Sequence, residues 1–176
     1  LNQSITYSYD SNGNLTKKAF HAYTTGTLST ATSEEVYTYG NTNWKDQLTS
    51  YKGQSIIYDE IGNPLTYRDG MDFTWSDGRK LSTITKGTDS IVYQYDVNGY
   101  RRYKIVNGVE TEYYWLNGQL EGQKTGTEYL HFLYDEKGTV YGFILKNETT
   151  EEYYYYEFNL QGDIIGIIDS TGTRVA

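Results

Sequence analysis

Polar and aromatic residues alternate along the chain, and glycine-containing turns interrupt the alternation at regular intervals. In the segment YSYDSNGNL (7–15), the alternation places Tyr7 and Tyr9 on one face of a strand, because successive strand side chains point to opposite faces. The same spacing returns at Tyr37 and Tyr39. No window shows the 3.6-residue period of an amphipathic helix. The pattern therefore predicts short strands joined by tight turns.

One aromatic residue, which we call the marker, stands directly before each turn and shows that the chain is an internal repeat. The markers are Tyr9, Tyr39, Tyr58, Trp75, Tyr95, Trp115, Tyr134 and Phe158. From Tyr39 to Tyr134 the steps are 19, 17, 20, 20 and 19 residues, which is the length of one β-hairpin. Two longer intervals carry Thr- and Glu-rich segments at about 24–36 and 146–152, which we expect to be exposed loop insertions.

Each repeat carries the same turn chemistry. A short carboxylate at the strand exit can accept hydrogen bonds from turn amides, and a glycine three residues later supplies positive φ. An apolar residue then restarts the returning strand. The residues predicted to carry this structural signature are Tyr7, Tyr9, Asp10, Gly13, Leu15, Tyr37, Tyr39, Tyr58, Asp59, Gly62, Leu65, Trp75, Asp77, Gly78, Leu81, Tyr93, Tyr95, Asp96, Gly99, Trp115, Gly118, Tyr134, Asp135, Gly138, Phe158 and Gly162.

Tandem hairpins of about 20 residues predict an all-β fold with one continuous, curved and twisted antiparallel sheet. We expect residues 1–176 to form a single domain. The last repeat differs from the others, because EEYYYYEF (151–158) and DIIGII (163–168) are apolar on both faces of their strands. A strand that is apolar on both faces is usually packed on both faces. We therefore predict that this hairpin is buried against more chain or a partner in a longer protein.

Composition narrows the function classes. The chain has 15 basic and 23 acidic residues, net charge −8, which argues against nucleic acid as a partner. Cysteine is absent, so disulfides and thiol chemistry are excluded. No apolar run has the length of a membrane span, and no signal peptide is recognised. The sequence begins at Leu1 and ends in STGTRVA, and we expect it to be a fragment of a larger protein.

Candidate catalytic and metal sites are weak. Asp163 and Asp169 are close in sequence, but turn formation explains both better than an acid pair. The segment DSNGN, which starts at Asp10, resembles the opening of a calcium loop, yet Leu15 stands where that loop requires glycine. His21 has no Glu or His at ligand spacing, and neither has the second histidine, His131. We therefore predict no catalytic residue, no metal and no cofactor.

The repeated Y-x-Y-D-x-x-G-N-L pattern resembles the tyrosine–aspartate (YD) repeat of the rearrangement-hotspot (RHS) proteins. Residues 39–67, YGNTNWKDQLTSYKGQSIIYDEIGNPLTY, are similar to RHS-type wall-associated polymorphic toxins of Gram-positive bacteria. Residues 153–175 resemble the segment before the core terminus of the family. The resemblance covers nearly the whole chain.

The resemblance implies a role that the periodicity alone does not. RHS proteins, insecticidal toxin-complex C components and teneurins use YD repeats as a spiral sheet that closes into a hollow shell, which in the bacterial proteins holds a variable C-terminal toxin. The implied chain is structural and non-enzymatic, secreted or at the cell surface, with the remaining repeats and a toxin domain as partners. The self-cleavage motif of D-P-x-G type is absent, since the single proline is Pro64, so no catalytic residue is carried over.

Two alternatives remain open at this point. Choline- and glycan-binding repeats of bacterial surface proteins also run at about 20 residues with paired aromatic residues, so a wall- or glycan-binding module is the second reading. The third is adhesion through the sheet edges or through the insertions 24–36 and 146–152. Free strand edges also predict self-association of the chain in isolation.

Overall fold

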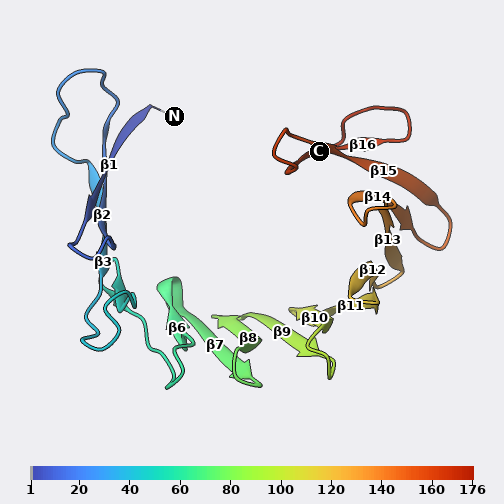
Figure 1. The fold of residues 1–176 in the computed structure, drawn as a ribbon, viewed down its shortest axis with the longest axis horizontal. Helices are drawn as coiled ribbons and strands as arrows, with labels where there is room; N and C mark the ends of the chain where they lie inside the picture. The colour runs from blue at the N-terminus through green and yellow to red at the C-terminus, as the bar shows by residue number, and fades with distance from the viewer. Residues whose placement is uncertain (1) are drawn as a thin grey trace. The chain divides into compact units, whose positions relative to one another are not determined.

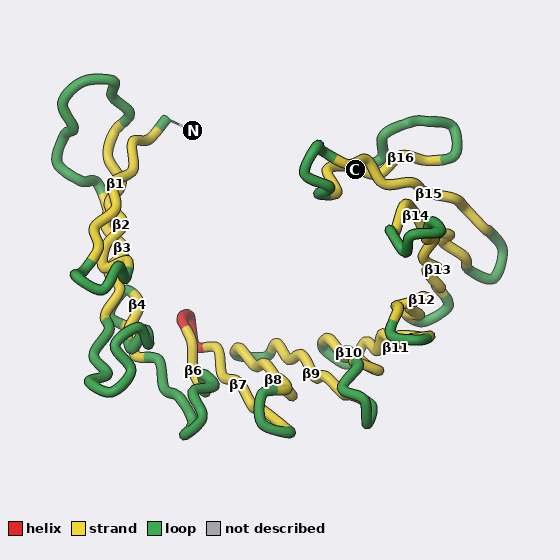
Figure 2. The backbone as a smooth tube through the Cα atoms, viewed as in Figure 1, coloured by secondary structure: helices red, strands yellow, loops and turns green. Residues whose placement is uncertain are grey.

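The computed structural model describes residues 2–176, which form sixteen β-strands and one short 3₁₀ turn, with no α-helix in this range (Figures 1 and 2). The predicted all-β chain of consecutive antiparallel hairpins is confirmed. The contacts divide into two compact units, which meet in sequence between Thr88 and Asp89. In a repeat array each hairpin contacts its neighbours in sequence, so such a division falls between two hairpins. The expectation of a single domain over 1–176 stays a prediction.

The first unit begins with five strands that pair antiparallel in chain order: β1 (Gln3–Tyr9), β2 (Leu15–Ala22), β3 (Ser33–Thr38), β4 (Ser50–Tyr51) and β5 (Gln54–Ser55). A second set follows: β6 (Thr66–Tyr67), the 3₁₀ turn (Arg68–Gly70), β7 (Met71–Ser76) and β8 (Lys80–Lys86), with β6 paired to β7 and β7 to β8. Within each set the connections are turns or loops between antiparallel neighbours, but β5 and β6 are not paired, so these strands belong to two sheets rather than to the one continuous sheet that the repeat predicts.

The second unit contains eight strands, each paired antiparallel with the next: β9 (Asp89–Tyr95), β10 (Arg101–Val106), β11 (Val109–Leu116), β12 (Gln119–Thr125), β13 (Glu128–Tyr134), β14 (Val140–Lys146), β15 (Glu151–Phe158) and β16 (Ile164–Asp169). The chain then turns back along β16, where the Val175 amide donates to the Ile167 carbonyl at 2.8 Å. The hairpin pattern therefore continues through the described end of the chain.

The markers share one register in the sheet. The paired residues are Tyr9 with Leu15, Trp75 with Leu81, Trp115 with Leu120, Tyr134 with Val140, and Phe158 with Ile164. In each of these hairpins the register shifts directly before the marker. A bulge at this point increases the local twist and re-aims the side chain beside it. The repeat therefore sets a fixed orientation for the marker ring in each hairpin.

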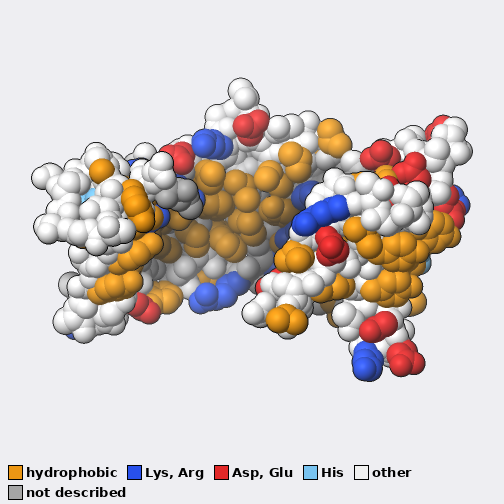
Figure 3. All heavy atoms as spheres, turned by 90° about the horizontal axis from the view of Figure 1, so that it is seen from above, with side chains coloured by type: hydrophobic (Ala, Val, Ile, Leu, Met, Phe, Trp, Pro, Cys, Tyr) orange, Lys and Arg blue, Asp and Glu red, His pale blue; other side chains and the backbone are white. Residues whose placement is uncertain are grey.

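Burial in the described residues is partial nearly everywhere. Ala19, Tyr51, Ile56 and Tyr113 are the buried hydrophobic residues, and many large side chains stay open, including Tyr9 at 62% exposure. Figure 3 shows hydrophobic side chains gathered in continuous patches rather than scattered singly. Tyrosine suits such half-covered positions, because its ring packs while its hydroxyl stays hydrogen-bonded. Neighbouring rings on the sheet, such as Tyr37 and Tyr51 with centres 5.0 Å apart, contribute to this packing.

The loop insertions are shorter than the sequence pattern predicts. Between β2 and β3 the loop spans 23–32, since β3 begins at Ser33 and its residues 33–36 pair with β2. Between β14 and β15 the loop spans 147–150, because Glu151 pairs with Lys146. Polar composition marked these strand ends as loop, although their backbone is hydrogen-bonded to the neighbouring strand.

Candidate functional site

The repeated aspartate closes its turn through both carboxylate oxygens. At the first turn, Oδ1 of Asp10 accepts hydrogen bonds from the amides of Asn12 (2.9 Å) and Asn14 (2.9 Å), and Oδ2 accepts from the Asn14 side-chain amide (3.0 Å). The amide of Gly13, whose φ is +87°, donates to the Asp10 carbonyl at 3.2 Å. Only glycine adopts such a φ without strain. The carboxylate is occupied by the turn itself rather than presented to a calcium ion.

The same pair of bonds, to the amides two and four residues later, recurs at Asp59, Asp96, Asp135, Asn159 and Asp169. In the first turn the carboxylate comes first and the side-chain amide four residues later. In the turn at Asn159 the order is reversed, and the Asn159 side-chain amide donates to the carboxylate of Asp163 at 2.9 Å. The sequence pattern did not reveal Asn159, because the pattern has aspartate at this position. An amide oxygen at the strand exit is the signal that would have found it.

Hydrogen bonds to these carboxylates stabilise their charged form. The Asn14 backbone amide, opposed by a smaller effect of burial, lowers the pKa of Asp10 below its ordinary value. The Thr171 hydroxyl and the Thr173 amide lower the pKa of Asp169 in the same way. Asp10 and Asp169 therefore remain ionised as turn acceptors.

Side chains also link one turn to the next in the first unit. The side-chain amide of Asn63 donates to the Gly78 carbonyl at 2.7 Å, and a guanidinium nitrogen of Arg79 donates back to the Ile61 carbonyl at 2.9 Å. Asn63 is 3% exposed, so this bond is shielded from water. These two bonds therefore link the turn at 59–63 to the turn at 77–79.

A second turn type closes other hairpins. Asp77 and Gly78 have φ of +45° and +83°, and Asn117 and Gly118 have φ of +51° and +83°. Two successive residues with positive φ define the two-residue type I′ hairpin turn. The sequence pattern predicts one turn chemistry for all repeats, but Asp77 lies inside its turn and its carboxylate pairs with Lys80 at 3.3 Å instead. The aspartate–glycine spacing distinguishes the two types.

The markers carry a contact that the sequence pattern does not reveal. The polar tips of four markers donate a hydrogen bond to a backbone carbonyl earlier in the chain: the Tyr58 hydroxyl to Leu48 (2.7 Å), the Trp75 indole N–H to Pro64 (2.7 Å), the Trp115 indole N–H to Arg101 (2.8 Å) and the Tyr134 hydroxyl to Leu120 (2.7 Å). We call this series the tip ladder. Burial raises the pKa of Tyr58 and of Tyr134, which keeps both phenols protonated as donors.

The tip ladder follows a rule. In three cases the acceptor is the residue that pairs with the preceding marker: Pro64 opposite Tyr58, Arg101 opposite Tyr95, and Leu120 opposite Trp115. Each of these three hairpins is therefore tied to the one before it by a side chain. The sequence signal was present, since all markers except Phe158 carry a donor at the tip.

Glutamate–tyrosine pairs two residues apart form a second recurring contact. The tyrosine hydroxyl donates to the glutamate at Tyr37–Glu35 (3.3 Å), Tyr114–Glu112 (2.8 Å), Tyr153–Glu151 (3.1 Å) and Tyr154–Glu152 (2.6 Å). Residues two apart share a face of a strand, so an E-x-Y motif places these groups side by side. Burial, together with the neighbouring Glu35 charge, raises the pKa of Tyr37 to about 12. These tyrosines are hydrogen-bond donors at neutral pH.

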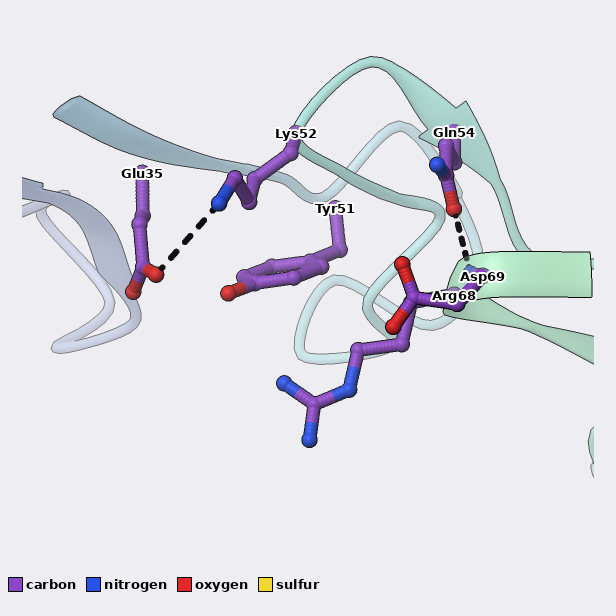
Figure 4. A pocket seen from close by; sticks show the side chains of 6 residues that line it. All are labelled: Glu35, Tyr51, Lys52, Gln54, Arg68 and Asp69. Atoms are coloured by element: carbon purple, nitrogen blue, oxygen red, sulfur yellow. Dashed lines mark hydrogen bonds and ion pairs between the residues drawn. The ribbon is translucent and has the colours of Figure 1, made fainter. Parts of the chain in front are cut away.

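A polar hollow of about 400 Å³ lies in the first unit (Figure 4). It is lined by Glu35, Tyr51, Lys52, Gln54, Arg68 and Asp69. The Lys52 ammonium lies 3.6 Å from Glu35, and the Arg68 guanidinium lies 5.4 Å from the centre of the Tyr51 ring. Two cations and two carboxylates balance one another here. The lining groups therefore contact each other and favour no single class of ligand.

An aromatic hollow of about 420 Å³ lies in the second unit, lined by Tyr95, Gly99, Tyr100, Arg101, Tyr113, Trp115 and Leu120. The rings of Tyr100 and Trp115 are stacked with centres 4.9 Å apart. The Trp115 indole is part of the tip ladder, so its polar edge is already bonded to the protein. The ring faces are the part of this surface that a ligand could meet.

The described residues offer no metal centre, since no three His, Asp or Glu side chains gather as ligands among residues 2–176. His21 is buried and bonded instead, to the Ser29 carbonyl (2.8 Å) and the Thr6 hydroxyl (3.1 Å). No helix within this part of the chain has the length and hydropathy to cross a membrane. The repeated turns and the tip ladder remain the features that the signature residues build.

Comparison with known proteins shows the same repeat in much longer chains. The chain is 33% identical over 98% of its length to the tRNA nuclease WapA of Bacillus subtilis, and 32% identical over 98% to the tRNA3(Ser)-specific nuclease WapA of Bacillus spizizenii. It spans 7% of the length of each of these relatives. No protein-family model matches the chain.

The fold is that of a solved structure as well. A crystal structure of TcdB2-TccC3 without its hypervariable C-terminal region matches 98% of this chain with a TM-score of 0.64 at 19% identity, and the match covers 9% of that chain. The hairpins, their turns and these matches define an all-β repeat protein of RHS, or YD-repeat, type. Among such proteins it is similar to the WapA nucleases of Bacillus.

Proposed function

We propose that this chain is a structural segment of the sheet wall of an RHS-type toxin, which encapsulates or presents a C-terminal effector lying outside the described repeats. The similarity to relatives that are many times longer supports this reading, since this chain matches only 7% of the length of each. The observation that carries this proposal is that the carboxylates of the turns and the polar tips of four markers bond to the backbone of the chain itself, which is a structural use of these groups.

The proposal assigns no enzymatic reaction to these residues. The relatives are named as tRNA nucleases, but the carboxylates of Asp10 and Asp59 accept hydrogen bonds from turn amides, and their pKa values are lowered. A nuclease activity then belongs to another part of the protein. A secreted or cell-surface location, in a Gram-positive bacterium, and partnership with the remaining repeats and an effector domain are parts of the same proposal.

Limited proteolysis of the parent protein tests whether the repeats enclose an effector. If the repeats enclose an effector, the C-terminal region resists protease in the wild type and becomes accessible when Trp75→Ala removes a marker ring and its bond to Pro64. Asp72→Ala, at an exposed position on the same strand, is the matched control and leaves protection unchanged. A C-terminal region that is digested as fast in the wild type as in the variant contradicts encapsulation.

A glycan-binding module is the second candidate, and one observation favours it. The stacked Tyr100 and Trp115 rings border an aromatic hollow, and such ring faces bind sugars. Titration of peptidoglycan fragments or choline, followed by tryptophan fluorescence of wild type and Trp115→Phe, tests it. A saturable fluorescence change that is lost in Trp115→Phe supports a glycan-binding module. Fluorescence that does not change on titration contradicts this module and favours the structural role in the sheet wall.

A further inference from the structure

The dipeptide Asn-Gly occurs four times in the chain, and each copy lies in a hairpin turn: Asn12–Gly13, Asn98–Gly99, Asn107–Gly108 and Asn117–Gly118. Asparagine before glycine can deamidate without an enzyme. The glycine nitrogen attacks the side-chain carbonyl carbon, the carbon–nitrogen bond of the side-chain amide breaks, and ammonia leaves with the proton of the glycine amide. Water then opens the succinimide ring to aspartate or isoaspartate. Hydrogen bonds to the glycine N–H or to the asparagine side chain oppose the attack, because they must break first.

In two of the four turns the attacking nitrogen is occupied. The Gly13 amide donates to the Asp10 carbonyl at 3.2 Å, and the Gly99 amide donates to the Asp96 carbonyl at 3.0 Å. The amide of the asparagine before each glycine donates to the carboxylate of the same aspartate at 2.9 Å. The turn aspartate therefore holds the reactive dipeptide in place, and attack costs at least one hydrogen bond of the turn.

The other two copies form a matched pair in type I′ turns of the second unit. Asn107 and Asn117 have φ of +49° and +51°, and a glycine with positive φ follows each. The Asn107 side chain is held at both ends, since its Nδ2 donates to the Asp89 carboxylate at 3.0 Å and its Oδ1 accepts from the Ser90 amide at 2.7 Å. Among residues 2–176 the exposed Asn117 side chain has no hydrogen-bond partner, and neither has the Gly118 amide. Asn117 alone thus combines a free side chain with a free nucleophile.

The fold itself requires a glycine after Asn117. Gly118 has φ of +83°, and a Cβ at this position would lie 2.9 Å from the Tyr100 hydroxyl, so both backbone conformation and space exclude a side chain. The first position of the turn tolerates aspartate as well as asparagine, as Asp77 shows at φ of +45°. The aspartate product therefore fits this turn, and the isoaspartate product, with one more carbon in the main chain, does not.

We propose that Asn117 is the preferred site of spontaneous deamidation in the folded chain, and that its isoaspartate form loosens the hairpin β11–β12. The proposal goes beyond the wall function, because it assigns a covalent change to one turn. The two-residue turn sets the pairing of Leu116 with Gln119, and a longer main chain breaks that register. The change lies beside Trp115, whose indole bonds to the Arg101 carbonyl, so it weakens one step of the tip ladder.

Incubation of the full chain at mildly alkaline pH, followed by tandem mass spectrometry of its peptides, measures the conversion of amide to acid at all four sites. The tryptic peptide 105–124 contains both Asn107 and Asn117. We expect Asn117 to deamidate about threefold to tenfold faster than each other site, the effect of one net hydrogen bond. In urea the four sites convert at similar rates, because the dipeptide is the same and the turns are lost. Native rates that are alike, or an Asn107 as fast as Asn117, overturn the proposal.

Two variants and one exchange measurement complete the test. Asp89→Ala removes one bond that holds Asn107, and it raises the rate at Asn107 toward that of Asn117 without changing Asn117. Asn117→Gln suppresses conversion at its own turn and leaves the other three sites unchanged. Hydrogen exchange of β11–β12 is faster in the isoaspartate fraction of the aged protein than in Asn117→Asp, which mimics the other product. Equal exchange in these two forms overturns the loosening of the hairpin.

Discussion

At the scale of single residues, the aspartate at the strand exit acts as a hydrogen-bond acceptor, and Asp59 is an example. Its Oδ1 accepts from the amides of Ile61 (3.1 Å) and Asn63 (2.8 Å), and its Oδ2 accepts from the Asn63 side chain (2.8 Å). We expect Asp59→Ala to lower Tm by about 2–4 °C, because turn amides lose their acceptor. Thermal unfolding followed by circular dichroism measures it.

The exchanged pair at Asn159 and Asp163 supplies a rescue for this variant. The double variant Asp59→Asn with Asn63→Asp copies the arrangement in which the amide comes first and the carboxylate four residues later. We expect it to recover most of the Tm lost in Asp59→Ala. A double variant as unstable as Asp59→Ala would mean that the turn depends on the Asp59 charge rather than on its acceptor geometry.

The turn aspartates also predict an acid response. Hydrogen bonds, led by the Asn14 amide at Asp10 and by the Thr171 hydroxyl at Asp169, depress the folded-state pKa below the ordinary value of 3.8. Their stabilisation is therefore complete above pH 3.8 and is lost as pH falls through the depressed pKa values. We expect the urea midpoint to be flat, as far as these groups decide it, from pH 7 to about 5 and to fall below pH 4. A midpoint that falls between pH 7 and 5 would assign the acid response to other groups.

At the scale of elements, the insertion between β2 and β3 is an anchored loop. The buried His21 donates from Nδ1 to the Ser29 carbonyl (2.8 Å), since a carbonyl only accepts, and its Nε2 faces the Thr6 hydroxyl (3.1 Å). Ser4 and Thr24 add a second tie, with the Thr24 amide 3.2 Å from the Ser4 hydroxyl. The loop is thus fastened to the first hairpin at its middle and at its start.

Removal of the histidine is expected to free the loop while the hairpin survives. His21→Ala increases protease cleavage within 23–32 by about tenfold, because the open loop becomes the dominant state. Mass spectrometry of the fragments locates the cut, and His131→Ala on β13 is the matched control. Equal cleavage in wild type and His21→Ala would show that the Ser4–Thr24 tie suffices.

Elements of the fold were predictable where the cause is local. Strand alternation and turn glycines such as Gly13 are encoded within nine residues, so the hairpins and their spacing follow from the sequence. The tip ladder was not predictable from the sequence, because a bond such as that from Trp115 to Arg101 joins different hairpins. It also depends on the bulge beside the marker. The type I′ turn at Asp77 was misread because its aspartate precedes the glycine directly.

At the scale of the whole molecule, charge is distributed unequally between the two units. Residues 1–88 hold eight basic and nine acidic residues, net −1, whereas residues 89–176 hold seven basic and fourteen acidic residues, net −7. Like charge opposes association of the second unit with itself, and salt screens this repulsion. The first unit has no such protection.

The edge strand β1 is therefore where we expect self-association to begin. Its sequence QSITYSY contains no charge and no proline, the residues that blunt a free edge, and Ile5 and Tyr7 on it are 39% and 52% exposed. Light scattering at rising concentration detects association in the wild type, and Ile5→Lys on this edge reduces it. Val97→Lys, at a 99% exposed position of the second unit, is the matched control. Association that grows strongly with salt and ignores Ile5→Lys would instead place the contact on the acidic second unit, because only there does screening remove a large repulsion.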